Sequence, residues 1–307
     1  MKKIAIVLSV LLLGSLSWAQ GSDHSRVQIT VSKISGSVYL LQGEGGNIAA
    51  SIGDDGIVMV DDEYADLAEK IHAALKTLSD KPMRFVINTH LHIDHVGANP
   101  YFQKLAPVIA HGNVRKRLSE AGTIGNGGSI KFPIKPLPAT DLPMITFKRE
   151  ITLHMNGEDI HVIHLRNGHT DGDSIVYFPK SNVVHMGDDF LRIGFPFVDL
   201  DSGGNVLGWI EALEEIIAWL PPDVKVIPGH GPVSNLDNVR EFIKMMKDTR
   251  GVVARGMQQG KSLDQLKREK VLEAWSNWSG EWITSDLYLE TLYNDLSRGA
   301  EISAHRP

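Results

Sequence analysis

The sequence contains no cysteine in 307 residues. This absence excludes disulfide bonds, thiolate metal ligands, a cysteine nucleophile and attachment of a lipid to an N-terminal cysteine. Any metal ion that the chain binds must therefore be held by nitrogen and oxygen atoms.

An excess of positive charge is also lacking. The chain has 31 Lys and Arg against 37 Asp and Glu, which gives a net charge of −6 and a pI of about 6.1. No general basic field exists that would attract nucleic acid or an anionic membrane. We therefore expect a small-molecule substrate and no nucleic-acid partner, and a phosphodiesterase is less favoured than an acyl hydrolase.

The apolar run near the N-terminus, residues 4–13, is too short to span a bilayer comfortably. Two lysines precede it, and Ser17-Trp18-Ala19 then offers small residues where a signal peptidase cleaves. This pattern predicts a signal peptide over residues 1–19 and a periplasmic or secreted protein with no stable membrane insertion after cleavage. An uncleaved membrane anchor is the alternative.

The composition, 42% hydrophobic and 22% charged, is typical of a globular protein with a large core. Short runs between Gly-rich turns predict strands at 27–33, 38–42, 47–52 and 57–61, and a continuous apolar-rich run predicts a buried strand at 84–88, followed by a short strand at 108–110. An alternating pattern then predicts a second set at 145–147, 151–155, 158–165, 174–178 and 183–186, with a final strand at 224–227. Helical periodicity is found at 64–78, 99–104, 112–120, 206–220, 235–256, 262–276 and 283–297. Two β-rich halves with flanking helices suggest an α/β sandwich over residues 20–235, and we expect the C-terminal helices of 236–307 to pack on the same domain.

Residues 121–143 have neither helical nor strand periodicity, because glycines and prolines interrupt every run. Loops of this length in a compact domain are usually functional or disordered. We interpret the segment as a connector between the two halves, and a mobile lid over the site is the alternative function.

Four potential metal ligands lie within six residues, directly after the buried strand predicted at 84–88: His90, His92, Asp94 and His95. Imidazole and carboxylate groups bind zinc-like cations near neutral pH when they converge on one point. A loop allows the first two to point one way and the others another way, so the spacing favours two adjacent metals. The alternative is a polar surface loop without a metal.

Three later ligands follow predicted strands in the same manner. They are His169, Asp188 and His230, and each is preceded by a glycine, which permits a tight turn and close approach to a ligand. Strand ends that meet at one edge of a sheet bring such side chains together. We therefore expect these three loops and the first cluster to share one edge.

With these motifs in this order, the chain resembles the metallo-β-lactamase superfamily from about Val38 to His230. The resemblance implies a four-layer αββα sandwich, here with a C-terminal helical extension, and a site for two Zn²⁺ ions. It implies the following ligands: His90, His92 and His169 for one zinc, Asp94, His95 and His230 for the second, and Asp188 as a bridge. A set of N and O donors also accepts manganese or iron.

One position departs from the best-known β-lactamases of this superfamily, which carry Cys, or a Ser that does not bridge, where this chain has Asp188. An Asp there resembles glyoxalase II and many broad metallo-hydrolases. The two cations that these ligands would hold would supply a hydroxide for attack on an acyl bond, and Asp94 is expected to orient that nucleophile or relay a proton. A β-lactamase, a lactonase or thioesterase, and a non-enzymatic periplasmic metal-binding accessory protein remain open.

Residues outside the ligand set are expected to fix the orientation of the imidazoles. Asp61, at a strand end, is the leading candidate, and capping of the following helix is its alternative role. Thr170 and Asp173 either brace the loop of His169 or only shape its turn.

Three residues that follow Asp188 are candidates for binding substrate. Arg192 could meet a substrate carboxylate, and Phe195 and Phe197 could form walls of the pocket. Plain packing is the alternative for both phenylalanines. The other histidines of the chain's interior are expected to be structural: His72, His154, His161, His164 and His185. His111, which follows a strand end, comes closest to being an exception.

Overall fold

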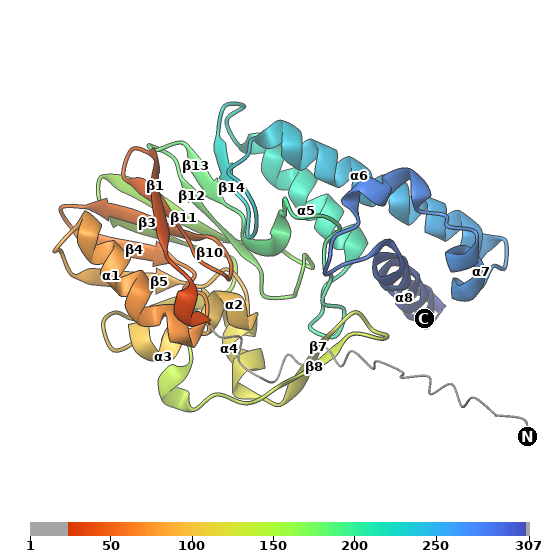
Figure 1. The fold of residues 1–307 in the computed structure, drawn as a ribbon, viewed down its shortest axis with the longest axis horizontal. Coiled ribbons are helices and arrows are strands. Elements are labelled where there is room, and N and C mark those ends of the chain that lie inside the picture. Colours follow the sequence, from red (N-terminus) through yellow and green to blue (C-terminus); the bar gives the residue numbers. More distant parts are fainter. Residues whose placement is uncertain (1–23, 305–307) are drawn as a thin grey trace, which may run out of the picture.

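The structure is a computed structural model that describes residues 24–304. The predicted signal peptide, residues 1–19, lies outside this range. Within it, the strands form two large sheets and one small hairpin, and helices cover both outer faces of the pair of large sheets (Figure 1).

The first large sheet has seven strands in the order β1-β2-β3-β4-β5-β6-β9. Its first four strands are antiparallel, and β4, β5, β6 and β9 are parallel. The strands are Thr30–Ser35, Val38–Gln42, Ile48–Gly53, Gly56–Val60, Met83–Ile87, Val108–His111 and Ile145–Phe147.

The second large sheet has five strands in the order β10-β11-β12-β13-β14. The first four are antiparallel, and β14 runs parallel to β13. The strands are Glu150–Met155, Glu158–His164, Ser174–Phe178, Val183–His185 and Lys225–Ile227. Because β11, β13 and β14 run in the same direction, their carboxyl ends lie at one edge of the sheet.

Helices make up the outer layers and the C-terminal extension. The helices are α1 (Ala68–Leu78), α2 (Ile93–Val96), α3 (Asn99–Phe102), α4 (Gly112–Ser119), α5 (Val206–Trp219), α6 (Leu236–Gln258), α7 (Leu263–Arg268) and α8 (Ser285–Ala304). Of the helices within residues 24–304, none combines the length and the apolar character that crossing a membrane requires.

Side-chain alternation along the strands separates the layers of the sandwich. In β4, Ile57 and Met59 pack with helix α1 on the outer face, whereas Val58 and Val60 join the cluster between the two sheets. In β12, Val176 belongs to that same inner cluster. The fold is therefore the expected αββα sandwich, with two sheets face to face and helices outside.

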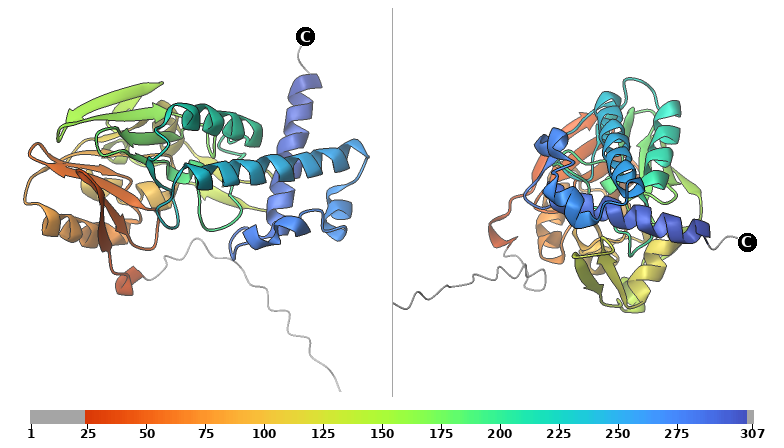
Figure 2. Two further views of the ribbon diagram at one scale, coloured as in Figure 1. Left: turned by 90° about the horizontal axis from the view of Figure 1, so that it is seen from above. Right: turned by 90° about the vertical axis from the view of Figure 1, so that its right-hand side faces the viewer.

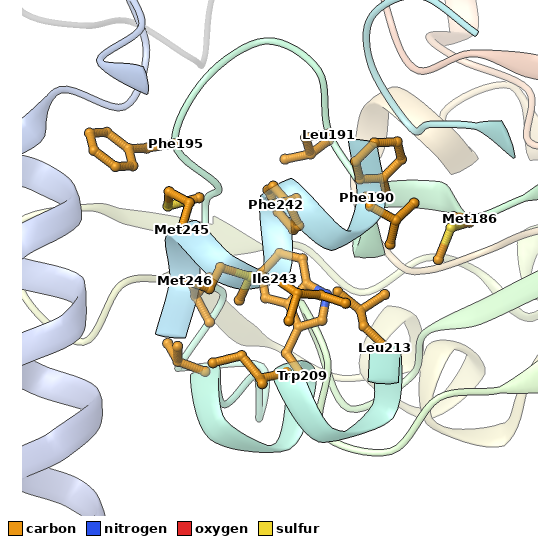
Figure 3. Close-up of a cluster of buried hydrophobic side chains, with 14 of the residues drawn as sticks. Met186, Phe190, Leu191, Phe195, Trp209, Leu213, Phe242, Ile243, Met245 and Met246 are labelled. Carbon is orange, nitrogen blue, oxygen red and sulfur yellow. The ribbon is translucent and has the colours of Figure 1, made fainter. Parts of the chain in front are cut away.

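The outer face of the second sheet carries the largest hydrophobic cluster, which joins α5, α6 and α8 to the sheet. Trp209 of α5 and Phe242 of α6 lie at its centre, with ring centroids 5.8 Å apart, and Phe195 lies toward α8 (Figure 3). Figure 2 shows the C-terminal helices at one end of the sandwich. Their apolar contacts make them part of the same core.

Two predictions about local structure need correction. The segment 121–143 contains an antiparallel hairpin, β7 (Gly122–Gly125) and β8 (Lys131–Ile134), and a 3-10 turn at Ala139–Asp141. Strands of four residues that contain glycine and proline give no readable alternation. The single helix predicted at 262–276 is α7 followed by a 3-10 helix, Glu273–Trp278, because Lys270 adopts a left-handed φ of 50° that ends the helix.

Candidate metal centre

The predicted ligands meet at one edge of the sandwich. His90, His92, Asp94 and His95 lie in the loop after β5 and in the short helix α2, and the later three lie in the loops that follow β11, β13 and β14. Their donor atoms form two groups, and the donor atoms of each group all lie within 4.8 Å of one another. The structure thus brings all seven predicted ligands together.

The first group, called here the inner group, consists of His90, His92 and His169. The Nε2 atom of His169 lies 2.9 Å from Nδ1 of His92, and His90 packs edge-on against both rings. All three side chains are buried. Three imidazole nitrogens therefore converge on one small volume.

The second group, called here the outer group, consists of Asp94, His95 and His230. The Nε2 atom of His230 is 3.1 Å from Oδ2 of Asp94 and 3.3 Å from Nε2 of His95. The side chain of His230 is 20% exposed, whereas that of His95 is fully buried. This group therefore lies at the surface end of the site.

Asp188 lies between the two groups. Its Oδ2 atom is 3.7 Å from Nε2 of His169 and 3.9 Å from Nε2 of His90. Its Oδ1 atom is 3.1 Å from Nε2 of His95 and 3.6 Å from Nε2 of His230. One carboxylate thus faces both groups, which is the geometry that a bridging ligand requires.

At the centre of the site, the buried Nε2 atom of His90 has no hydrogen-bond partner among the described residues. A buried polar atom without a partner costs about 1–3 kcal/mol, and a cation held between His90 and the neighbouring donors would satisfy it. Imidazole and carboxylate donors suit zinc, manganese and iron. The residues present therefore fit a metal centre.

Burial keeps two of the inner histidines, His90 and His169, neutral. Burial is the main reason why the pKa of His169 falls to about 4, and the nearby His92 lowers it further. Burial also lowers the pKa of His90 well below its ordinary value, with a further contribution from His95. These rings therefore present unprotonated nitrogens at neutral pH, which is the form that binds metal.

The charges of the outer group reinforce one another. Burial alone would raise the pKa of Asp94, but the neighbouring His95 and His230 outweigh it and bring the value to about 2. Burial likewise would lower the pKa of His95, but Asp188 and Asp94 hold it well above its ordinary value. The pKa of His230 is raised for the same reason. The carboxylates of Asp94 and Asp188 thus favour the protonated form of both histidines.

Asp61 contacts the outer group, as the sequence suggested. Its Oδ2 atom is 2.8 Å from Nδ1 of His95, and the same carboxylate accepts hydrogen bonds from the backbone N and the hydroxyl of Thr89. Asp61 also has a left-handed φ of 62°. Its carboxylate fixes the orientation of His95 so that Nε2 faces the site.

Thr170 and Asp173 shape the loop that carries His169. The backbone N of Thr170 donates to Oδ2 of Asp173 over 2.7 Å, and its hydroxyl donates to the other carboxylate oxygen. Burial raises the pKa of Asp173 to about 8. The ring of His169 is held separately, because its Nδ1 donates to the carbonyl of Phe197 over 2.7 Å.

The sequence analysis missed one residue of the site, Asp199. Its Oδ2 atom lies 3.0 Å from Nε2 of His92, and its Oδ1 accepts from the backbone N of Gly125 and of Ser202. Asp199 is fully buried. The available signal was an acid between two apolar residues, Val198 and Leu200, in a segment with no regular structure.

The three proposed substrate contacts have different surroundings. Phe197 lies beside the inner group, with its ring centroid 5.8 Å from that of His92. Phe195 is instead buried in the core and stacks on Tyr288 of α8, which supports the packing alternative for this residue. The guanidinium of Arg192 lies 3.7 Å from Glu241 of α6, so its predicted role with substrate requires that it leave this carboxylate.

Three glycines make the close approach of the loops possible. A Cβ atom on Gly229 would lie 2.0 Å from Oδ1 of Asp188, and one on Gly46 would lie 2.2 Å from Cε1 of His95. A Cβ atom on Gly168 would lie 2.3 Å from Oδ1 of Asp189. At these positions the reason for glycine is space rather than backbone conformation.

The remaining interior histidines lie outside the two groups. His161 has Nδ1 3.2 Å from the hydroxyl of Thr152, and His185 has Nε2 2.8 Å from the carbonyl of Asn47. His111 and His164 stack on each other with ring centroids 3.7 Å apart. These contacts agree with structural roles.

Known proteins with similar sequences and folds fit this geometry. The sequence profile of the Metallo-beta-lactamase superfamily matches residues 50–230. The probable metallo-hydrolase YqgX of Bacillus subtilis (strain 168) is 28% identical over 174 residues, which cover 54% of this chain and 77% of the relative. A metallo-beta-lactamase type 2 of Bacteroides fragilis is 21% identical, and the matched region covers 75% of this chain and 90% of the relative. The crystal structure of DIM-1 metallo-beta-lactamase matches with a TM-score of 0.59 at 17% identity, over 72% of this chain and 99% of that chain.

Proposed function

Because the chain belongs to the metallo-beta-lactamase superfamily, we propose that it is an exported hydrolase that binds two zinc ions and cleaves an acyl bond of a small molecule. The observation that most strongly supports two ions is the position of Asp188, whose two oxygens face the inner and the outer group separately. When bound, a pair of divalent cations lowers the pKa of a shared water toward about 7 and polarises an acyl carbonyl.

Asp94 is the proposed catalytic residue of the chain itself. Its carboxylate is ionised at neutral pH, since neighbouring histidines overcome the effect of burial and bring its pKa to about 2. Its side chain is 19% exposed, so one part of the carboxylate faces the opening of the site. There it can orient a water molecule by accepting a hydrogen bond.

Among acyl compounds, β-lactams and lactones are the proposed substrates. The predicted signal peptide supports this choice, because glutathione thioesters are made in the cytosol. The metallo-beta-lactamase of Bacteroides fragilis among the relatives supports a β-lactam. The Asp at position 188 supports a lactonase or thioesterase instead, because the best-known β-lactamases carry Cys or Ser there.

Metal analysis and a hydrolysis panel on the purified mature protein test the proposal. We expect about two zinc ions per chain and turnover that a chelator abolishes. Nitrocefin set against a panel of lactones separates the two substrate classes. Tightly bound zinc without turnover of any acyl or phosphoryl substrate would instead support a metal-binding accessory protein.

A pair of histidine variants tests the ligand assignment. His92→Ala removes an inner nitrogen and should lose metal and activity together, whereas His161→Ala, on β11, should leave both nearly intact. Metal content and turnover are measured on both proteins. Equal losses from the two variants would contradict the assignment.

Export is tested separately. Mass spectrometry of the protein recovered from the periplasm of a bacterial host should give a mature chain that begins at Gln20. Recovery of the full-length chain in the membrane fraction would support the uncleaved anchor.

A further inference from the structure

Helix α8 presents a row of polar side chains to the β7–β8 hairpin. Glu290, Asn294 and Arg298 are spaced by four residues and therefore share one face of the helix. Glu290 Oε1 accepts from the backbone N of Ser129 over 2.6 Å, and Asn294 Nδ2 donates to the carbonyl of Asn126 over 3.1 Å. In Figure 1 the hairpin lies beside α8, far from it in sequence.

Arg298, the third residue of the row, holds the chain next to Asp199. Its Nη1 atom donates to the carbonyl of Leu200 over 2.6 Å, and its Nη2 atom donates to Oδ1 of Asp201 over 2.6 Å. A guanidinium is planar and binds two acceptors in a fixed relative orientation. Both residues that follow Asp199 are therefore fixed by one side chain.

The β7–β8 hairpin also contacts this segment, at Asp199 and Asp201. Gly125, the last residue of β7, donates its backbone N to Oδ1 of Asp199 over 2.8 Å, and its carbonyl accepts from the backbone N of Asp201 over 3.2 Å. Asp199 in turn contacts Nε2 of His92 at 3.0 Å. A continuous series of hydrogen bonds thus connects α8 to an inner-group histidine.

We propose that Arg298 is a positioning residue for His92, which acts through residues 199–201, and that helix α8 thereby sets the metal affinity of the inner group. The proposal rests on the metal centre of the proposed function. It assigns a role in the site to a segment outside residues 50–230, which the family profile matches. The carboxylate of Asp199 fixes the ring of His92, Gly125 donates to that carboxylate, and Arg298 holds the two residues that follow it.

The first test compares two arginine variants in the full mature protein. Arg298→Met removes both hydrogen bonds, and Arg240→Met is the matched control, because Arg240 pairs with Asp237 on the exposed face of α6. Loss of a residue in direct contact with a metal ligand typically weakens binding by about 10–100-fold. We expect a smaller loss, roughly three- to tenfold, for Arg298→Met in a chelator competition with zinc, and none for Arg240→Met.

Two further readouts separate positioning from a purely structural role. With cobalt in place of zinc, the d–d absorption bands report the ligand geometry, and they should shift in Arg298→Met but not in Arg240→Met. Arg298→Lys keeps the charge and one donor, so it should recover part of the lost affinity. A lower melting temperature of metal-free Arg298→Met with unchanged zinc affinity and unchanged cobalt bands would overturn the proposal.

A double-mutant cycle tests the route through Asp199. If Arg298 acts through Asp199, Arg298→Met should change zinc affinity in the native background and have no further effect beside Asp199→Ala. Full additivity of the two losses would overturn the route. A native protein that binds no zinc would refute the proposed metal centre, whereas native binding with unaltered affinity in Arg298→Met refutes only this inference.

Discussion

The inner and outer groups use similar donors, but the protein holds them differently. In the inner group the second nitrogen of each ring contacts another atom: the hydroxyl of Thr89 for His90, the carboxylate of Asp199 for His92, and a backbone carbonyl for His169. Ligands fixed in this way lose little freedom when a metal binds.

The outer group combines one rigid ligand with two that reach the surface. His95 is buried and is held by Asp61, whereas the side chains of Asp94 and His230 are 19% and 20% exposed and contact each other. For the proposed two-metal site, this comparison predicts that the inner group binds its metal tightly and that the outer group binds a more exchangeable metal that substrate can reach. Each of the following predictions tests this difference.

Asp188→Ala should have the largest effect, because this carboxylate faces both groups. We expect fewer than one bound metal per chain and a loss of turnover of about 10²–10³-fold or more. Metal analysis after gel filtration and steady-state kinetics measure this. The control is Asp159→Ala, because Asp159 forms an exposed pair with His154. An Asp188→Ala variant that kept two metals would exclude Asp188 as a bridging ligand.

Replacing one histidine in each group should separate the two sites. His169→Ala should lose the tightly bound metal, whereas His230→Ala should keep about one metal per chain after dialysis against a weak chelator. The reason is that the inner group retains its buried, fixed ligands in the second variant. Identical metal content in both variants would mean that the groups bind as one cooperative unit.

Acidification should release the outer metal before the inner one. The pKa of His95 is raised despite its burial, because Asp188 and Asp94 favour the protonated ring. A cation that binds His95 must therefore displace a proton even at a pH where His169 is already unprotonated. Burial lowers the pKa of His169 to about 4. As the pH falls from 8 to 6, the zinc affinity of the outer group should fall by about tenfold per pH unit for each displaced proton. Zinc titrations at several pH values measure this. If the two groups do not differ, the affinities of both metals will depend on pH in the same way.

The smallest effects are expected from the supporting carboxylates. Asp199→Asn should weaken the inner metal and Asp61→Asn mainly the outer metal, each by about tenfold, because Asp199 contacts His92 directly and Asp61 contacts His95 directly but reaches His90 only through Thr89. Stepwise zinc competition on both variants measures the two affinities. The comparison between groups fails if either variant weakens both metals equally.

The sequence predicted the parts of the site that depend on local patterns. The cluster from His90 to His95 is visible because its members are close in the chain, and His169, Asp188 and His230 are visible because each follows a readable strand and a glycine. The strands themselves were predictable because they form short apolar runs bounded by turn residues, as in β4 and β12, which are buried at every position.

Other parts depend on contacts between distant segments, which one sequence does not reveal. Asp199 lies 107 residues from His92 and occupies a segment without periodicity. The hairpin in 121–143 depends on pairing between Gly122 and Ile134 and on contacts with α8. These contacts anchor the hairpin and favour the connector interpretation, while its function as a lid stays a prediction.

The contacts at Gly46, Gly168 and Gly229 have a consequence for how this protein can diversify. Because a methyl group at any of them would overlap an atom of the site or its support, selection for a new substrate has almost no freedom at the backbone that surrounds the candidate metal ligands. Variation must accumulate instead in neighbouring segments that project outward, such as the one with Ile193, whose side chain is largely exposed. The chemistry and the choice of substrate can therefore evolve at different rates in the same short loops.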